Sequence, residues 1–346
     1  MIGNDIPKVD KNRSKKDLMI SARKYFKGAK RVLDSHMDSL IVPRSNFIHD
    51  ESGKDSDRPM SIATYVISCT FKRDNVDSNA DFRTYPISED MIFSRFRFKS
   101  KLTDKRKKVK SALDYLEDSG SIVREYLDKN DVGKKGSLFV IKYLAEETSD
   151  GRKMFMTIPN DSLDKILNMD TDIEKINSLA VATGIMIRMN VINSDGYEKS
   201  VNSDDSWSEA LSLNNIVSYE GMLSIGLRTG LDRNTVSVYV NKLVEAEVIS
   251  VIKVKKHVSK HGGWSNIYSK FEERWLLKRY VEVLADTVLP SKHAALNIVD
   301  VWDEDIAQKE ATVNIIENYE EDDEYGYEDL DNNGLDIMIN IKSNVN

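Results

Sequence analysis

Two short helices joined by a tight turn are the strongest local prediction in this 346-residue chain. The segment GLRTGLDRNTVSVYVNKLVEAEVIS runs from Gly226 to Ser250. Ser218 is expected to cap the first helix, and Gly230 is expected to end it, because glycine adopts the left-handed backbone that stops a helix. The carboxylate of Asp232 is placed to accept a hydrogen bond from the backbone N–H of Thr235 and so cap the second helix.

The second helix is expected to be amphipathic and to lead into a strand. Val236, Val240 and Leu243 recur at helical spacing and predict a buried face, and a strand begins at Val248 and Ile249. Gly226 suits a close approach between the two helices, because glycine has no side chain. The opposite face offers groups that can bond phosphates or base edges, namely Arg233, Asn234, Ser237, Asn241 and Lys242.

A strand, a basic turn and a return strand are expected after this helix. The sequence ISVIKVKKHV, which includes Lys255 and Lys256, is followed by a turn at 260–263 and by WSNIYSKF. Such a hairpin places its lysines where they can contact phosphates beside a helix that lies in a groove. The pattern therefore predicts a helix pair with a basic hairpin attached.

The same pattern occurs earlier in the chain. Val109, Leu113, Leu116 and Ile122 are spaced like Val236, Val240, Leu243 and Ile249, and Gly136 of SLFVI falls on Gly263 of WSNIY. Upstream, Ser88 can cap a short helix, EDMIFSRF, and a further helix starts near Thr103. Amphipathic helices share such spacings by chance. The two glycine-containing turns at matching positions favour a true repeat, and so two domains in tandem.

Charge is segregated along the chain, whose overall net charge is -7. Residues 303–346 are strongly acidic, whereas 95–110 (RFRFKSKLTDKRKKVK) is strongly basic. Counterion release favours such a basic cluster beside a phosphate backbone, and the alternative is a solvated helix face. The expected phosphate contacts are Lys105, Arg106, Lys108 and Lys110.

The residues 226–250, with their capped helix and following hairpin, resemble the winged helix-turn-helix superfamily of DNA-binding proteins. Two such domains in tandem resemble plasmid and phage replication initiators, as does MFMTIPNDSLDKIL before the second copy. The resemblance implies an α+β, mostly α fold that binds double-stranded DNA at an origin, with one domain on DNA and the other on DNA or at a homodimer interface. The acidic tail and the turn before the third helix of the first copy depart from that pattern.

The expected organisation is an N-terminal helix and linker (1–58), a first winged-helix domain (59–145), a second (154–290) and a disordered acidic tail (303–346). The helix is expected over 13–40 and a polar linker over 45–59. In the first domain, the apolar run 62–71 fits either a helix or a strand. In the second, a strand (154–158), a short helix (159–167) and a buried helix (173–192) are expected to precede the loop 193–214.

Composition and motifs argue against several other classes. The single cysteine, Cys69, lies in an apolar run and is expected to be buried, without a disulfide framework. No GxxxxGK[ST] loop, no GxGxxG after a strand and no paired histidines of a nicking enzyme occur. His257 and His261 have metal spacing but lie in the predicted basic hairpin, and 329–340 completes only half of a calcium loop. No catalytic residue, metal or cofactor is therefore expected.

The sequence predicts a non-enzymatic, cytoplasmic, sequence-specific binder of duplex DNA, without membrane contact, that initiates replication of a plasmid or phage. The alternatives are a winged-helix transcriptional regulator with the same DNA chemistry and a protein-interaction scaffold. The acidic tail is expected to bind a protein partner, to compete with DNA for the basic hairpins, or only to keep the chain soluble.

Overall fold

The computed structural model describes 39–49, 56–72, 82–99, 102–128, 130, 132, 134–147, 154–189, 213, 216–256, 264–274, 276–280, 296–300 and 312–313. These residues form helices and small antiparallel sheets, in agreement with the predicted α+β class. Contacts divide the chain into two compact units. One unit contains 1–37, 189–221 and 249–346, and the other contains 38–188 and 222–248. This grouping cuts across the expected domain boundaries, because 222–248 fall in the unit that holds the whole first repeat.

The first half of the larger unit follows one path of strand, helices and hairpin. β1 (Ser39–Pro43) and α2 (Asn46–His49) lead into α3 (Arg58–Cys69), which is followed by α4 (Glu89–Arg95) and α5 (Leu102–Asp118). The hairpin of β2 (Ile122–Tyr126) and β3 (Phe139–Tyr143) closes the series. Between α3 and α4, the segment 83–87 bridges to β3 through Arg83–Lys142 and Ile87–Phe139 pairs.

The second half of this unit begins with the same order of elements. β4 (Phe155–Pro159) leads into α6 (Asn160–Leu167) and α7 (Asp172–Met186), and α10 (Met222–Thr229) and α11 (Arg233–Glu245) follow later in the chain. β1 and β4 pair antiparallel, with Ser39 opposite Pro159 and Pro43 opposite Phe155. The strand that opens one repeat is thus paired with the strand that opens the other.

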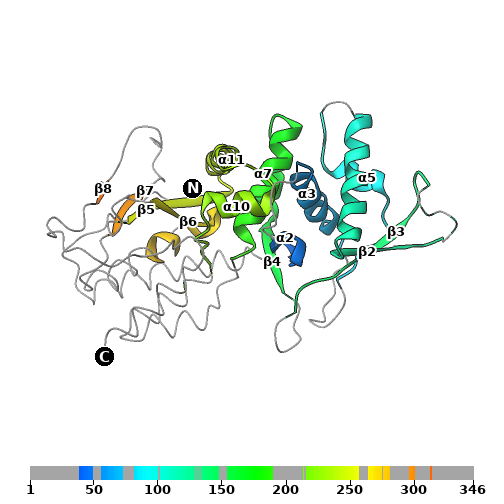
Figure 1. The fold of residues 1–346 in the computed structure, drawn as a ribbon, viewed down its shortest axis with the longest axis horizontal. Helices are drawn as coiled ribbons and strands as arrows, with labels where there is room; N and C mark the ends of the chain where they lie inside the picture. The colour runs from blue at the N-terminus through cyan, green and yellow to red at the C-terminus, as the bar shows by residue number, and fades with distance from the viewer. Residues whose placement is uncertain are drawn as a thin grey trace. The chain divides into compact units, whose positions relative to one another are not determined.

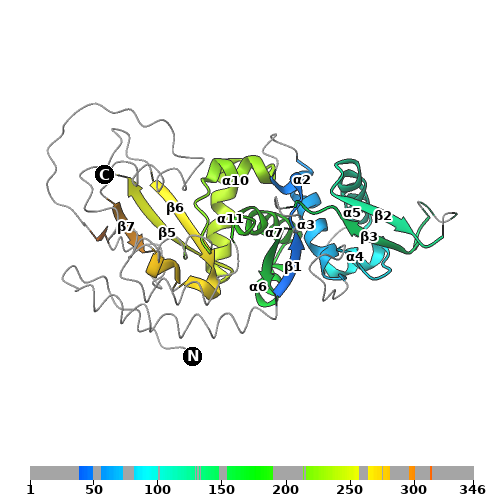
Figure 2. The ribbon, with the colours of Figure 1, turned by 90° about the horizontal axis from the view of Figure 1, so that it is seen from below.

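Four helices pack in a row within this unit, in the order α5, α3, α7 and α11 (Figures 1 and 2). All twelve residues of α3 are buried, because α3 lies between α5 and α7. α7 is also buried on nearly every side, and its N-terminus carries a capping box in which Thr171 and Glu174 exchange hydrogen bonds. α5 and α11 lie at the two ends of the row and each keeps one face exposed.

A buried arginine ties α3 to the helix pair of the second repeat. Arg58 donates from Nε to the carbonyl oxygen of Arg228, at 2.6 Å, and from Nη2 to that of Phe47, at 2.6 Å. Its guanidinium also lies 4.9 Å from the centroid of the Phe47 ring. A buried charge is costly unless hydrogen bonds satisfy it, so these contacts fix the start of α3 against α10.

The smaller unit contains a four-stranded antiparallel sheet. β5 (Ile249–Lys256) and β6 (Trp264–Lys270) lie side by side in Figure 2, and a 3-10 turn (Phe271–Glu273) follows β6. β7 (Leu296–Asp300) pairs with the other edge of β5, and β8 (Thr312–Val313) pairs with β7. Ser218 exchanges backbone hydrogen bonds with Tyr268 of β6, at 3.0 and 2.9 Å.

The hairpins of the two repeats have the same register. Ile122 pairs with Tyr143 and Ile249 with Lys270, so position 122 becomes position 249, an offset of 127 residues that also holds for the second strand. The remaining pairs of β2–β3, down to Tyr126 with Phe139, map onto pairs of β5–β6 with this offset. The repeat predicted from apolar spacing is therefore present in backbone pairing.

Several local predictions are confirmed. The side chains of Ser88 and Asp232 cap α4 and α11, and the Asp232 carboxylate accepts from the N–H of Thr235 at 3.0 Å. Gly230 has a φ of 76° and ends the turn after α10. The predicted core positions of both helices and of the strands that follow them are buried: Val109, Leu113, Leu116, Ile122, Val236, Val240, Leu243 and Ile249. Cys69 is buried too, and burial raises the pKa of its thiol to about 12.

Other local predictions are wrong. Ser218 does not cap the first helix of the pair, which begins at Met222, because its backbone is paired with Tyr268. The polar run 45–59 is not a plain linker, since it contains α2 and the start of α3, and Phe47 and Ile48 are buried. For the apolar run 62–71, where the sequence left helix and strand open, the structure contains the helix, which ends at Cys69. The expected buried helix ends at Met186 rather than at 192.

Some predictions fall outside the described residues. The N-terminal helix over 13–40 is one of them, except that Ser39 and Leu40 belong to β1. The turn at 260–263, the loop 193–214 apart from Leu213, and His36, His257, His261 and His293 are others. Within the predicted acidic tail only Thr312 and Val313 are described, as β8.

Candidate nucleic-acid interface

α11 exposes the face that the sequence singled out. Asp232 holds the start of the helix, and its carboxylate accepts from the backbone N–H groups of Asn234 and Thr235 at 3.0 Å each. The hydroxyl of Thr235 also donates to this carboxylate, and this bond, followed by the backbone ones, lowers the pKa of Asp232. Beyond the cap, Arg233, Asn234 and Asn241 are exposed and Ser237 is half-buried. The face is therefore free of the packing that holds the Val236 side.

Val238 is part of this exposed face and was not selected from the sequence. Its side chain is 51% exposed, although valine is apolar and the neighbouring Val236 and Val240 are buried. The helical spacing of residue 238 relative to Asn234 and Asn241 is the signal that could have found it, since residues three and four apart are neighbours on a helix.

Lys242 pairs with a residue of α7. Its Nζ lies 2.5 Å from Oε1 of Glu174 in the capping box of α7, and the two side chains are 37% and 20% exposed. This hydrogen bond lowers the pKa of Glu174 and raises that of Lys242. Lys242 thus fixes α11 against α7, and the prediction that it belongs to the open face is not supported by its geometry.

α5 carries the basic cluster at the other end of the helix row. Lys107, Lys108 and Lys110 are exposed, and Lys107 was not among the predicted contacts. Arg106 is exposed as well, but it pairs with Asp90 at 3.0 Å and lies over the Phe93 ring at 4.9 Å. Lys105 is half-buried, with Nζ 5.6 Å from the Phe98 ring centroid. Of the four predicted cations of α5, Arg106 and Lys105 therefore have contacts nearby, whereas Lys108 and Lys110 are exposed.

The basic link before α5 is attached to the second repeat, although Arg97 and Lys99 remain exposed. Arg97 has a φ of 53° and donates to Asn168 and Asp164, at 3.0 and 3.3 Å. Lys175 donates to the carbonyl oxygen of Arg97 at 2.5 Å, and burial lowers the pKa of Lys175. A non-glycine residue in this backbone region is uncommon and is held by its surroundings. The link therefore positions the start of α5.

The end of α5 is fixed to β2 by Arg124. Its guanidinium donates to Glu117 at 2.7 and 2.9 Å and to Asp114 at 2.6 Å, while its side chain is only 8% exposed. Burial by itself lowers the pKa of Arg124, but the hydrogen bonds to the two carboxylates outweigh burial and raise it. Charge-assisted pairs of this geometry are strong and specific. Arg124 thus holds the C-terminal end of α5 against β2.

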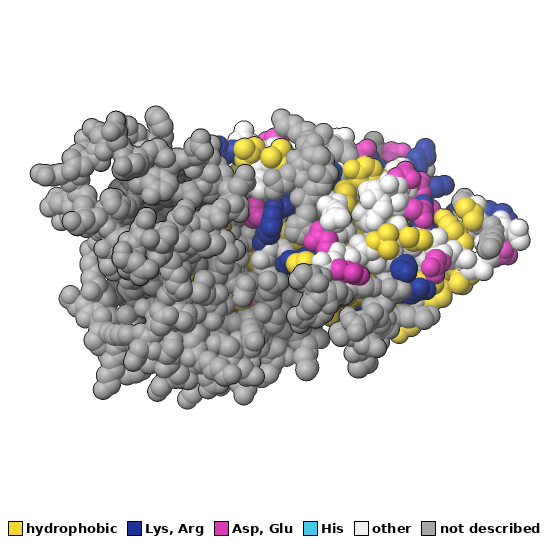
Figure 3. Space-filling view, turned by 60° about the horizontal axis from the view of Figure 1, so that its bottom comes forward, with side chains coloured by type: hydrophobic (Ala, Val, Ile, Leu, Met, Phe, Trp, Pro, Cys, Tyr) yellow, Lys and Arg dark blue, Asp and Glu magenta, His cyan; other side chains and the backbone are white. Residues whose placement is uncertain are grey.

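The first hairpin exposes apolar side chains. Val123, Leu127, Val132 and Leu138 are between 37% and 61% exposed. Figure 3 shows hydrophobic side chains beside charged ones towards the end of the described surface that this hairpin forms. In the second hairpin, the backbone of Lys255 pairs with Trp264 and with Asn297 of β7, and that of Lys256 pairs with Leu296 of β7. Only the backbones of these two lysines are described.

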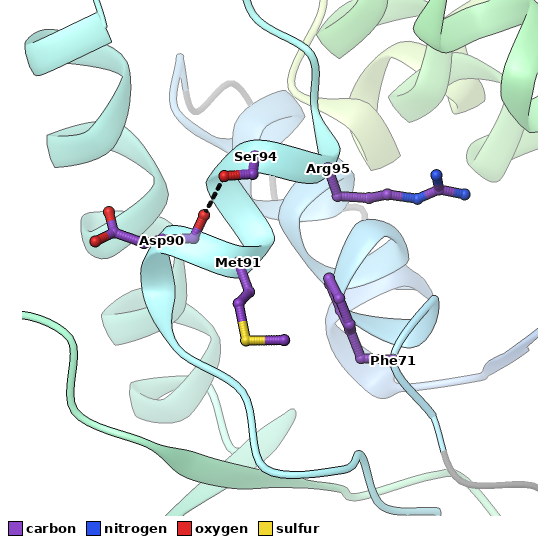
Figure 4. Close-up of a pocket in the computed structure, with 5 residues that line it drawn as sticks. All are labelled: Phe71, Asp90, Met91, Ser94 and Arg95. Carbon is purple, nitrogen blue, oxygen red and sulfur yellow. Dashed lines mark hydrogen bonds between the residues drawn. The ribbon is translucent and has the colours of Figure 1, made fainter.

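An open hollow lies between α4 and the end of α3 (Figure 4). It has a volume of about 440 Å³ and is lined by Phe71, Asp90, Met91, Ser94 and Arg95. Met91 and Phe71 face each other across it, whereas Asp90 and Arg95 point away in opposite directions. Ser94 uses its hydroxyl within α4, donating to the carbonyl oxygen of Asp90 at 2.7 Å. The hollow brings no set of polar groups together and offers no arrangement for catalysis.

Comparisons with protein-family models, curated proteins and solved structures found no match to this chain. Within the described residues, no group of three or more His, Cys, Asp or Glu could hold a metal ion. None of the described helices is long and apolar enough to cross a bilayer.

Proposed function

We propose that this protein is a non-enzymatic, sequence-specific binder of double-stranded DNA built from two tandem winged-helix domains. The observation that carries the proposal is the repeat itself. Each copy has a helix pair whose second member, α5 or α11, keeps a polar or basic face exposed and leads into a hairpin of the same register. In both copies an upstream segment bridges to the second hairpin strand. This order of elements is the one that places a helix in a major groove.

Both end helices of the row, α5 and α11, would contact DNA through their exposed faces. Arg233, Asn234, Ser237 and Asn241 would contact DNA from α11, and Lys107, Lys108 and Lys110 from α5.

The leading biological role is replication initiation of a plasmid or phage type, which rests on the resemblance of the tandem arrangement and of 154–167 to such proteins. A transcriptional regulator would use the same contacts. The exposed apolar side chains of the first hairpin support one further proposal, that this hairpin contacts a protein partner or a second copy of the chain.

The test is selection of bound fragments from fragmented plasmid and genomic DNA at about physiological salt, followed by sequencing. Low salt would let non-specific phosphate binding dominate. Clustered direct repeats among the bound fragments would support an initiator, and single palindromes near promoters would support a regulator. The variant Arg233→Glu should lose selective binding, whereas Arg188→Glu, the same charge change at an exposed residue just after α7 that is assigned no DNA contact, should keep it. Selection of no fragment by the parent protein would contradict the proposal and favour the scaffold.

A further inference from the structure

The exposed face of α11 is chemically unlike the equivalent face of α5. With the offset of 127 that the hairpins define, Arg233, Asn234, Ser237 and Val238 correspond to Arg106, Lys107, Lys110 and Ser111. Three of the four α5 residues are cations, and one of the four α11 residues is. The α5 face suits phosphates, which any sequence provides. The α11 face is built mainly from amides, a hydroxyl and an apolar group, which suit base edges.

Lys242 would add a second cation to the exposed face of α11, but it pairs with α7 instead. Lys242 lies 2.5 Å from Glu174, and this pair joins α11 to α7. Arg233 stands at the first position of the helix. The middle of the exposed face is left to Asn234, Val238 and Asn241, and its most unusual member is Val238, because half of this apolar side chain faces solvent.

These three residues are neighbours on one side of the helix. Asn234 and Val238 are four residues apart and Val238 and Asn241 are three apart, so their side chains adjoin. An asparagine amide can bond both N6 and N7 of adenine, and an apolar side chain can contact the methyl group of thymine. Adenine and thymine are partners in one base pair, so amides on both sides of a valine match a short run of A·T pairs.

From this face we infer that α11 reads A·T base pairs in the major groove, with Asn234 and Asn241 bonding adenines and Val238 packing on a thymine methyl group. The inference rests on the proposed function and makes Val238 a residue that determines specificity. The sequence-independent part of the affinity then comes largely from α5.

The test uses duplexes selected by the full-length protein from a library with a randomised core. Each thymine of a selected duplex is replaced in turn by deoxyuridine, which lacks only the methyl group. At one or more positions the parent protein should bind about fourfold more weakly, the value expected for one buried methyl-sized group. In Val238→Ser the same replacement should have no effect, because the apolar partner is gone. Val238→Thr, which keeps one methyl group and the shape of valine, should keep part of the effect.

The asparagines are tested on the same duplexes. Asn234→Ala or Asn241→Ala should reduce the preference for A·T over G·C at one position, a preference expected to be roughly 5- to 150-fold in the parent protein. Selected sites without thymine-sensitive positions, or a deoxyuridine effect that persists in Val238→Ser, would overturn the inference while leaving the proposed function intact. Failure of the parent protein to select any duplex would instead contradict the proposed function. Since Val238 and both asparagines are exposed, circular dichroism of each variant should match that of the parent protein.

Discussion

Gly120 and Glu247 occupy the same backbone position in the two repeats, two residues before the first paired residue of each hairpin. Their φ angles are 69° and 54°, both in the left-handed region. The hydrogen bonds around them also match, with Ser121 N–H donating to Leu116 and Val248 N–H donating to Leu243, at 2.9 and 2.8 Å. This is the usual way to end a helix and turn the chain into the next element. One repeat uses glycine there and the other uses glutamate.

Gly120→Ala and Glu247→Gly should therefore shift stability in opposite directions. A residue with a Cβ in the left-handed region costs about 1–2 kcal/mol, and a Cβ at Gly120 would meet no atom within 4 Å, so the conformation alone sets the cost. Gly120→Ala should lower the free energy of unfolding by about 1 kcal/mol. Glu247→Gly should raise it by a smaller amount, because the 3.7 Å pair with Lys165 is lost. Urea unfolding measures both, and equal signs would contradict the assignment of a shared cap.

Gly226 should tolerate no side chain. A Cβ there would lie 2.6 Å from the carbonyl oxygen of Leu231, a backbone atom that cannot move alone. Gly226→Ala should reduce the free energy of unfolding towards the upper end of the about 1–3 kcal/mol range for overpacking. Gly184→Ala is the matched control, since its Cβ would meet a side-chain methyl of Thr229 at 3.0 Å, which can shift. Thermal unfolding of the two variants should rank them in that order, and the reverse order would refute the close approach.

Acid should weaken the attachment of α11 to α7. Hydrogen bonds, first of all from Lys242, lower the pKa of Glu174 below its ordinary 4.5. Between this lowered native pKa and 4.5, the Glu174 carboxylate of the unfolded chain binds a proton more readily than that of the native protein. The contribution of the pair to stability is therefore complete above pH 4.5 and is lost as the pH falls through the lower native pKa.

In Glu174→Gln this acid-dependent loss should be smaller. Burial raises the pKa of Glu89 and of Glu146, which gives a contribution of opposite sign that both proteins share. The difference between parent and variant in urea unfolding from pH 7 to pH 3 isolates Glu174. Parallel curves over that range would show that the pair adds nothing to folding.

The α5 cations should control the salt dependence of DNA binding rather than its selectivity. Each phosphate contact contributes about 0.9 to the slope of log K against log salt concentration. The double variant Lys107→Gln/Lys110→Gln should lower this slope by roughly 2 while the ratio of specific to random duplex affinity stays similar. Titration of both duplexes over a salt series measures this. An unchanged slope would place α5 away from the phosphates.

The predictable part of this fold was local. The caps at Ser88 and Asp232, the turn at Gly230 and the buried faces of α5 and α11 follow from chemistry within a few residues, and the structure contains them. Apolar spacing also predicted the repeat from α5 onward, because equal spacing reflects equal burial. The whole hairpin register then agreed with it.

The candidate site was only partly predictable, because exposure on a helix depends on what packs against it. Arg233, Asn234 and Asn241 were identified from their polarity, whereas Val238 was missed because an apolar residue normally predicts core. Lys242 was assigned to the open face, but Glu174, 68 residues earlier in the chain, captures it.

By itself, the sequence determined the caps of α4 and α11, which residues form the buried faces of α5 and α11, and that one arrangement is used twice, because these depend on contacts within one helix or hairpin. Tertiary structure alone decided that β1 pairs with β4 and that α3 is buried on all sides between α5 and α7. It also decided that Arg97, Arg58 and Lys242 bind other parts of the same chain. Those partners lie far apart in the chain. Their meeting depends on how whole elements pack, which local patterns do not encode.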